Sequence, residues 1–188
     1  MAAKSTLKNM LLCLTGVCLV CSALLAGTYA LTLEPIAAAQ KAKTNASIAR
    51  VLPEFQGDAV PSTVSFDGVD YTCYTVDGVG RAIISNTSGF GGTLSVMVGI
   101  TDDGKLFNTA VLSHSETPGL GAKCQSDEKF LSQFRGLDPA AARLSVKKDG
   151  GDLDAITAST ITSRAYTLAV ANAVKVFNQL NEGGQENE

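Results

Sequence analysis

The stretch Asp154–Ser163, which reads DAITASTITS, joins a dense group of polar side chains to the start of a helical pattern. It holds five hydroxyl side chains and one carboxylate. After it, apolar residues recur at steps of three and four, which is one face of a helix. They are Tyr166, Val170, Ala173, Val174, Phe177 and Leu180, and Gly183 and Gly184 end the pattern. The sequence therefore predicts a C-terminal helix whose N-terminus carries hydroxyl groups.

Spacing alone leaves two explanations of these hydroxyl groups open. Serine and threonine are common N-caps, whose side chains accept hydrogen bonds from the first backbone N–H groups of a helix. The same N–H groups and the helix dipole also favour an anion, so that a phosphate would be well held there. The first explanation needs no ligand, whereas the second predicts a phosphate-binding site.

Charge and cysteine content narrow the classes of function. Residues 34–188 carry 13 Lys and Arg against 18 Asp and Glu, a net charge of −5, which argues against nucleic acid or an anionic membrane surface as a partner. No histidine lies near a cysteine, and the single histidine, His114, has no acid–base constellation around it. We therefore predict no metal site and assign no catalytic residue. Cys73 and Cys124 either form a disulfide or are two buried small hydrophobic residues.

The N-terminal segment predicts a membrane anchor. Met10–Leu33 is a run of 24 uncharged residues, which is long enough to cross a hydrocarbon core of ~30 Å. Lys4 and Lys8 precede the run, which places the N-terminus in the cytoplasm and the bulk of the chain outside. A cleaved signal peptide, with its cleavage site at Thr28–Ala30, is the alternative.

The remaining turn and helix-start signals predict an α+β fold, in which an antiparallel sheet packs with helices and one N-terminal transmembrane helix precedes them. Pro35 opens a stalk helix at its first position. Asp67–Gly68 and Asp77–Gly78 each predict a two-residue hairpin turn. A short helix after Ser126 and a strand around Val146 are also expected. The predicted organisation is 1–33 for the cytoplasmic N-terminus and anchor, 34–60 for the stalk, 61–182 for the folded domain and 183–188 for a flexible tail.

The segment His114–Lys123, which reads HSETPGLGAK, predicts a rigid loop at the end of the sheet. Pro118 fixes φ, and its neighbouring glycines allow backbone geometry that other residues resist. Loops of this kind often hold ligands. Leu120 could present an apolar surface to a flat ring, and Glu116 and Thr117 could hydrogen-bond to it. The earlier Gly89–Gly92 is expected to be a bulge or tight bend.

Two motifs in this order resemble a known family. Asp154–Thr160 is similar to Asp-x-x-(Ser/Thr)-(Gly/Ala)-(Ala/Ser)-Thr, at which FMN-binding domains carry flavin through a phosphoester bond to the last threonine, here Thr160. The commonest form reads Gly-Ala where this chain has Ala158-Ser159. Together with Gly-Phe-Gly-Gly and His-x-Glu-Thr-Pro-Gly-Leu-Gly, the match from about Gly89 to Phe177 resembles the G subunit of the Rnf electron-transport complex. It is also similar to the C subunit of the Na⁺-translocating NADH:quinone reductase, which is usually longer.

The resemblance implies a membrane-anchored electron carrier with covalent FMN. It would be a redox subunit of an ion-translocating ferredoxin:NAD⁺ oxidoreductase, with no independent turnover and with Na⁺ or H⁺ as the coupling ion. Its expected partners are other membrane subunits and a flavin transferase, and its expected place is the inner (cytoplasmic) membrane, single-pass, with the soluble domain extracytoplasmic. The implied cofactor-binding residues are Thr160 as acceptor, with Glu116, Thr117, Gly119, Leu120, Gly121, Asp154, Thr157, Ala158, Ser159, Thr162 and Ser163.

Three alternatives stay open at this point. The chain could be a component like the C subunit of the quinone reductase. It could be a cofactor-free extracytoplasmic interaction module, in which Thr160 merely caps a helix. It could also be a freestanding flavin-dependent reductase, which would need acid–base residues around the flavin, and the chain offers few.

Overall fold

The computed structural model describes residues 7–55 and 59–184. The chain divides into two compact units, Met1–Lys43 and Thr44–Glu188. Helix α1 (Leu7–Val51) forms the described part of the first unit, and its last turns belong to the second. Of the predicted tail, residues 185–188 lie outside the described residues, and Gly184 is the last residue of helix α3 (Thr160–Gly184).

The apolar part of α1 is long enough to cross a membrane. Leu7–Ile36 spans 30 residues and is the one helix in the described ranges that has the length and composition for a membrane span. None of its most apolar window is buried inside the protein, so this surface needs an apolar surrounding. Pro35 lies inside α1, so the prediction that it begins a separate helix is wrong. A proline removes one backbone hydrogen bond, and here the helix continues past that loss.

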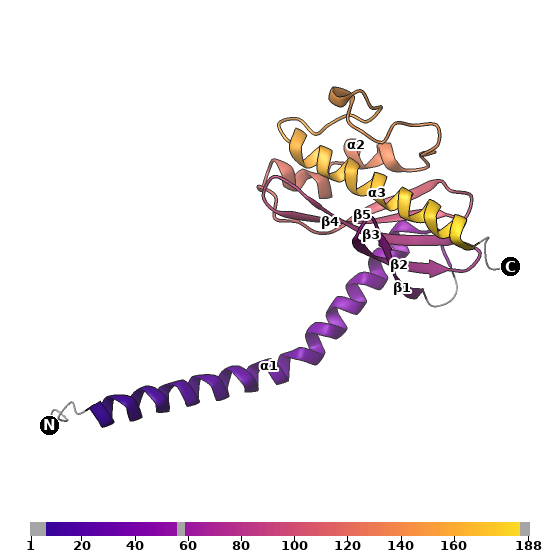
Figure 1. Cartoon of the computed structure of the whole chain (residues 1–188). Coiled ribbons are helices and arrows are strands. Elements are labelled where there is room, and N and C mark those ends of the chain that lie inside the picture. The colour runs from indigo at the N-terminus through magenta and orange to yellow at the C-terminus, as the bar shows by residue number, and fades with distance from the viewer. Residues whose placement is uncertain (1–6, 56–58, 185–188) are drawn as a thin grey trace. The chain divides into compact units, whose positions relative to one another are not determined.

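In the described part of the second unit, five antiparallel strands form one sheet in the order β1-β2-β3-β4-β5 (Figure 1). Each strand pairs with the next along the chain, so the sheet is a meander of hairpins. Nearly all of β4 is buried, which shows that both faces of the sheet are covered there. The strands are β1 (Val60–Phe66), β2 (Val69–Val76), β3 (Gly80–Ser88), β4 (Thr93–Thr101) and β5 (Leu106–Ser113).

The two Asp-Gly turns differ from each other. Asp67 and Gly68 have φ values of 52° and 74° between strands that pair at Phe66 and Val69, which confirms the predicted two-residue turn. At the second turn Val76 pairs with Gly80, so the loop has three residues and the two-residue prediction is wrong. The N–H of Val79 donates to the carbonyl of Val76 at 3.1 Å and closes this longer loop.

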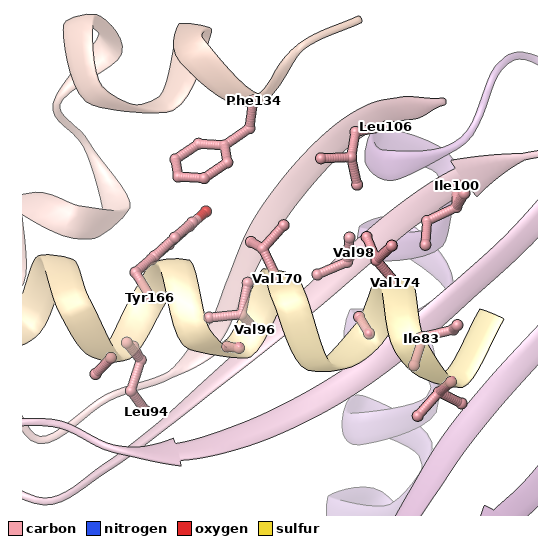
Figure 2. Packing of buried hydrophobic residues seen from close by; sticks show 14 of the residues in the cluster. Ile83, Leu94, Val96, Val98, Ile100, Leu106, Phe134, Tyr166, Val170 and Val174 are labelled. Carbon is pink, nitrogen blue, oxygen red and sulfur yellow. The ribbon is translucent and has the colours of Figure 1, made fainter. Parts of the chain in front are cut away.

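Helix α3 covers one face of the sheet (Figure 1). Alternate residues of a strand point to the same face, and in β4 these residues pack against the buried side of α3. Figure 2 shows this packing, with Val170 and Val174 of the helix above the strands. The strand residues in this layer include Ile83, Leu94, Val96, Val98 and Ile100. The apolar face predicted for the C-terminal helix is therefore confirmed.

Tyr166 of α3 joins this layer to the segment after β5. Its side chain is fully buried, and its hydroxyl donates to Thr109 Oγ1 at 2.8 Å. Its ring lies 5.1 Å from each of the rings of Phe130 and Phe134, centroid to centroid (Phe134 is seen in Figure 2). The burial of this aromatic group fixes the start of α3 against the loops that follow β5.

The opposite face is covered by the end of α1. Ile48, Val51 and Leu52 are buried and pack in one cluster with strand residues whose side chains alternate with those of the first layer. These strand residues are Val76, Ala82 and Met97. The last turns of the predicted stalk are thus part of the second unit's core.

Short helices connect β5 to α3. Asp127 accepts hydrogen bonds from the N–H groups of Lys129 and Phe130 and caps α2 (Glu128–Leu131), which confirms the predicted short helix. Single turns occur at η1 (Gly121–Gln125), η2 (Ser132–Phe134) and η3 (Lys147–Asp149). The predicted strand around Val146 is wrong, because Val146 forms an isolated bridge with Leu153 and η3 turns the chain away immediately after it.

Candidate functional site

The loop after β5 and the N-terminus of α3 meet at one pocket. Its volume is about 370 Å³, which lies in the range of roughly 300–1,000 Å³ typical of small-molecule sites. Three segments far apart in the sequence supply its walls: the β3–β4 turn, the loop after β5 and the residues around the start of α3. The lining residues are Phe90, Glu116, Thr117, Leu120, Gly121, Ala158, Ser159, Thr160, Ile161 and Thr162.

Helix α3 begins at Thr160, and the hydroxyl groups near its start have different partners. Ser163 Oγ accepts from the N–H of Ile156 and donates to the carbonyl of Ser159, both at 2.9 Å, so Ser163 ties the turn before the helix to its first turn. Ser159 Oγ is buried and has no hydrogen-bond partner in the described part of the chain. A buried polar atom without a partner is costly, so this hydroxyl is available to a ligand.

Ala158 has φ of 61°, in the left-handed region. For a residue with a Cβ this conformation costs roughly 1–2 kcal/mol, and glycine adopts it freely. The common form of the motif has glycine here, and the backbone geometry gives the physical reason. Strain of this kind is often found where a backbone is held ready for a ligand.

Glu116 holds the three segments together. Its carboxylate accepts from the hydroxyl of Thr162 at 2.7 Å and from the N–H of Gly91 at 3.3 Å, and its side chain is buried. The contact with Gly91 reaches the β3–β4 turn, and the contact with Thr162 reaches the first turn of α3. Both carboxylate oxygens are therefore engaged by the protein, so Glu116 shapes the wall of the pocket.

Two glycines make this close approach to Glu116 feasible. A Cβ on Gly89 would lie 2.0 Å from Glu116 Oε1, and a Cβ on Gly121 would lie 2.4 Å from Glu116 Oε2. Neither contact can be accommodated without moving the carboxylate. The glycines of Gly89–Gly92 form a tight bend, as predicted, since the N–H of Gly89 donates to the carbonyl of Gly92 at 2.8 Å.

Four of the residues predicted to bind the cofactor do not line the pocket. Gly119 and Thr157 are exposed beside it, and Ser163 is buried behind the helix start. Asp154 pairs with Lys147 at 2.9 Å, and its backbone N–H donates to Gln133 Oε1 at 2.6 Å. These contacts fix the course of the chain that leads into Thr160.

Sequence reasoning did not select two of the lining residues, Phe90 and Ile161. Phe90 is 69% exposed and Ile161 is 50% exposed, and with Leu120, at 45%, they place large apolar side chains around a polar wall. The one available signal was an apolar residue between glycines or between hydroxyl residues, where a core position is not expected. Only the fold shows that these three side chains share a site.

A charged side chain contacts the Thr160 hydroxyl, and the residue after it forms an ion pair with Arg164. Lys148 Nζ lies 3.4 Å from Thr160 Oγ1. Arg164 donates two hydrogen bonds of 2.6 Å to the carboxylate of Asp149. The hydrogen bond from Arg164 holds the pKa of Asp149 below its ordinary value, with smaller contributions from the Arg164 and Lys148 charges.

His114 and Cys124 both interact with Glu116. The N–H of Glu116 donates to His114 Nδ1 at 3.3 Å, and His114 Nε2 lies 3.1 Å from Gln125 Oε1, so both ring nitrogens of the histidine have hydrogen-bond partners within the protein. Cys73 and Cys124 are both free and buried, so the disulfide alternative is wrong. Burial and then the Glu116 charge raise the pKa of Cys124 to about 11, which keeps it a neutral thiol.

Comparisons with known proteins agree on this region. A family model described as FMN-binding domain matches residues 89–175. The G subunit of the ion-translocating oxidoreductase complex of Shewanella piezotolerans is 31% identical over 194 residues, which cover 94% of this chain and 91% of the relative.

Two further relatives match over shorter regions. The G subunit of the ion-translocating oxidoreductase complex of Shewanella baltica is 45% identical, over 48% of this chain and 44% of the relative. The G subunit of the proton-translocating ferredoxin:NAD(+) oxidoreductase complex of Clostridium ljungdahlii is 36% identical, over 56% of this chain and 57% of the relative. The chain thus spans about half the length of these two relatives.

Among solved structures, the C subunit of the Na⁺-translocating NADH-quinone reductase of Parabacteroides distasonis is 19% identical to this chain, with a TM-score of 0.47. The match covers 69% of this chain and 78% of that chain.

Proposed function

Because this chain belongs to the family of the G subunits of ion-translocating oxidoreductase complexes and contains an FMN-binding domain, we propose that it is an electron carrier that holds FMN covalently on Thr160. The observation that carries the proposal is the position of Thr160. Thr160 is the first residue of α3 and lines one wall of the pocket. The other walls are formed by the β3–β4 turn and by the loop in which glycines flank Leu120.

The residues around Thr160 fit a phosphate ester. The first N–H groups of a helix and its dipole stabilise an anion by about 0.3–1 kcal/mol at an exposed site. Ser159 Oγ, buried and without a partner in the described ranges, can donate to a phosphate oxygen. An ester bond to Thr160 would keep the cofactor at a very high effective concentration in the pocket.

The rest of the pocket suits the flat ring of a flavin. Phe90, Leu120 and Ile161 supply apolar surface. The carboxylate of Glu116 holds their three segments together through its hydrogen bonds. When bound, FMN supplies the electron-transfer chemistry, and the protein supplies position and electrostatics. Among the described residues that line the pocket, Glu116 is the one carboxylate, and both of its oxygens already accept hydrogen bonds from the protein. Because it is not free to act as an acid or base on a substrate, this arrangement argues against a freestanding reductase.

The partners follow from the same proposal. Leu7–Ile36 would anchor the chain as a single span of the cytoplasmic membrane, with the FMN-binding unit on the extracytoplasmic side because Lys4 and Lys8 precede the span. The donors and acceptors of electrons would be other subunits of a complex that couples electron transfer between ferredoxin and NAD⁺ to ion movement. A flavin transferase would form the ester.

The test is the site of flavin attachment. The full chain is produced with a flavin transferase, boiled in detergent and separated on a denaturing gel, and its intact mass is measured. We expect a flavin-fluorescent band whose mass exceeds the sequence by one FMN less one water. The band should be lost in Thr160→Ala and kept in Ser132→Ala, which removes an exposed hydroxyl outside both the motif and the pocket.

Two results would overturn the proposal. Fluorescence that persists in Thr160→Ala would move the attachment to another residue. A wild-type chain that keeps the mass of its sequence, beside an active transferase that modifies another acceptor, would remove the covalent flavin altogether.

A further inference from the structure

The ammonium group of Lys148 contacts the hydroxyl of Thr160, the proposed acceptor. In η3 (Lys147–Asp149), the first residue pairs with Asp154 at 2.9 Å and the third binds Arg164 through two 2.6 Å hydrogen bonds. The middle residue, Lys148, is exposed and has its Nζ 3.4 Å from Thr160 Oγ1.

The ammonium group of Lys148 differs from the neighbouring cations in the kind of group that it contacts. Lys147 and Arg164 each contact a carboxylate, whereas the ammonium group of Lys148 donates to the hydroxyl of Thr160. The buried hydroxyl of the preceding residue, Ser159, has no hydrogen-bond partner in the described ranges. A phosphodiester on Thr160 would carry one negative charge at the hydroxyl that the Lys148 cation contacts, and the residue before it in sequence carries a hydroxyl donor without a partner in the described ranges.

We propose that Lys148 and Ser159 form the phosphate-binding subsite for the group on Thr160, and that Lys148 speeds its attachment. The inference rests on the proposed function. In the transfer, the Thr160 oxygen forms a bond to the phosphorus that bears the flavin, and the bond from that phosphorus to the other half of a phosphoanhydride donor breaks. The hydroxyl proton leaves to a base on the transferase or to water. Lys148 can hold the non-bridging oxygens of this phosphorus throughout.

The experiment compares Lys148→Met with Lys147→Met in the full chain. Both variants remove one lysine from η3, but Lys147 contacts Asp154 and Lys148 contacts Thr160. The initial rate of flavin incorporation is measured from gel fluorescence with a fixed amount of transferase. From the usual strength of exposed ion contacts we expect Lys148→Met to slow incorporation roughly two- to fivefold, with Lys148→Arg and Lys147→Met close to wild type.

A second measurement separates binding of the phosphate from a structural role. In fully loaded protein, the ³¹P NMR signal of the ester should shift in Lys148→Met and Ser159→Ala and stay in place in Lys147→Met. Equal incorporation rates and an unchanged ³¹P signal in Lys148→Met would overturn the subsite while leaving Thr160 as the acceptor. A wild-type chain without flavin, or with flavin on another residue, would instead overturn the proposed function and this inference together.

Discussion

At the scale of single residues, neighbouring hydroxyl groups at the start of α3 serve different ends. Ser163 bridges the turn before the helix to its first turn, and Thr162 donates to the buried Glu116. Thr160 lines the pocket and faces Lys148. The hydroxyl of Ser163 thus holds the turn before the helix and that of Thr162 holds Glu116, whereas Thr160 lies on the pocket wall, which is why the phosphate-binding alternative is favoured for that residue.

The left-handed backbone at Ala158 predicts that Ala158→Gly stabilises the protein. Relief of the strain should exceed the entropy that glycine adds to the unfolded chain, for a net gain of about 0.5–1 kcal/mol. Thermal unfolding of the full chain in detergent, followed by circular dichroism, measures the change. Ala155→Gly, three residues earlier and without a positive φ, should instead destabilise by about 0.5–1 kcal/mol. A loss of stability in both variants would contradict the prediction.

The buried thiol of Cys124 predicts a loss of stability at alkaline pH. Burial, with the Glu116 charge, raises its pKa from 9.0 to about 11, so between these values the unfolded chain has released a proton that the folded chain keeps. The free energy of unfolding should hold below pH 9 and then fall by up to about 1.4 kcal/mol per pH unit. Urea titrations at pH 8, 9 and 10 should show a shallower fall in Cys124→Ala. An identical slope in that variant would assign the effect to other groups.

At the scale of elements, β4 is the centre of the fold because it contacts a helix on each face. Its residues Val96 and Val98 pack toward α3, and Met97 between them packs toward the end of α1. Gly99 belongs to the second face, where a Cβ would lie 1.7 Å from the carbonyl oxygen of Val51. The end of α1 can approach the sheet this closely because β4 has no side chain at that point.

Gly99→Ala should therefore loosen the end of α1. Overpacking of this kind costs typically about 1–3 kcal/mol, and the contact here is with backbone, which cannot rotate away. Hydrogen exchange measures the effect by segment: the amides of Ile48–Leu52 should exchange faster, while those of Tyr166–Phe177 keep their protection. Uniform acceleration of both segments would mean that the two faces of the sheet unfold together.

At the scale of the whole molecule, the two units need different surroundings. The apolar helix Leu7–Ile36 exposes its side chains, whereas Thr44–Glu188 contains its own core. That core includes the last turns of α1, so the compact unit begins well before the predicted domain start at residue 61. The helix that would cross the membrane is thus continuous with one that covers the cofactor-binding unit's sheet.

Two truncations test where the independent unit begins. A chain of residues 44–188 should be soluble without detergent and unfold cooperatively in urea. A chain of residues 59–188 keeps all of β1 but loses Ile48, Val51 and Leu52, each worth about 1.5–3 kcal/mol when buried, and should be much less stable or unfolded. Equal midpoints for the two chains would show that α1 contributes nothing to this core.

The sequence by itself determined the elements whose signals are local. The spacing from Tyr166 to Phe177 predicted α3, Asp67–Gly68 predicted its turn, and the uncharged run predicted a helix long enough to span a membrane. Each depends on residues within about one helix length of each other, so periodicity and turn chemistry suffice.

The tertiary structure decided what depends on residues far apart in the chain. It joined Phe90, Leu120 and Ile161 at one pocket, set Lys148 on Thr160, and placed the end of α1 against Gly99. It also continued α1 through Pro35, where local preference predicted a new start. The physical reason is that side-chain contacts across the sheet and between loops depend on packing of the whole unit, which no local pattern of residues records.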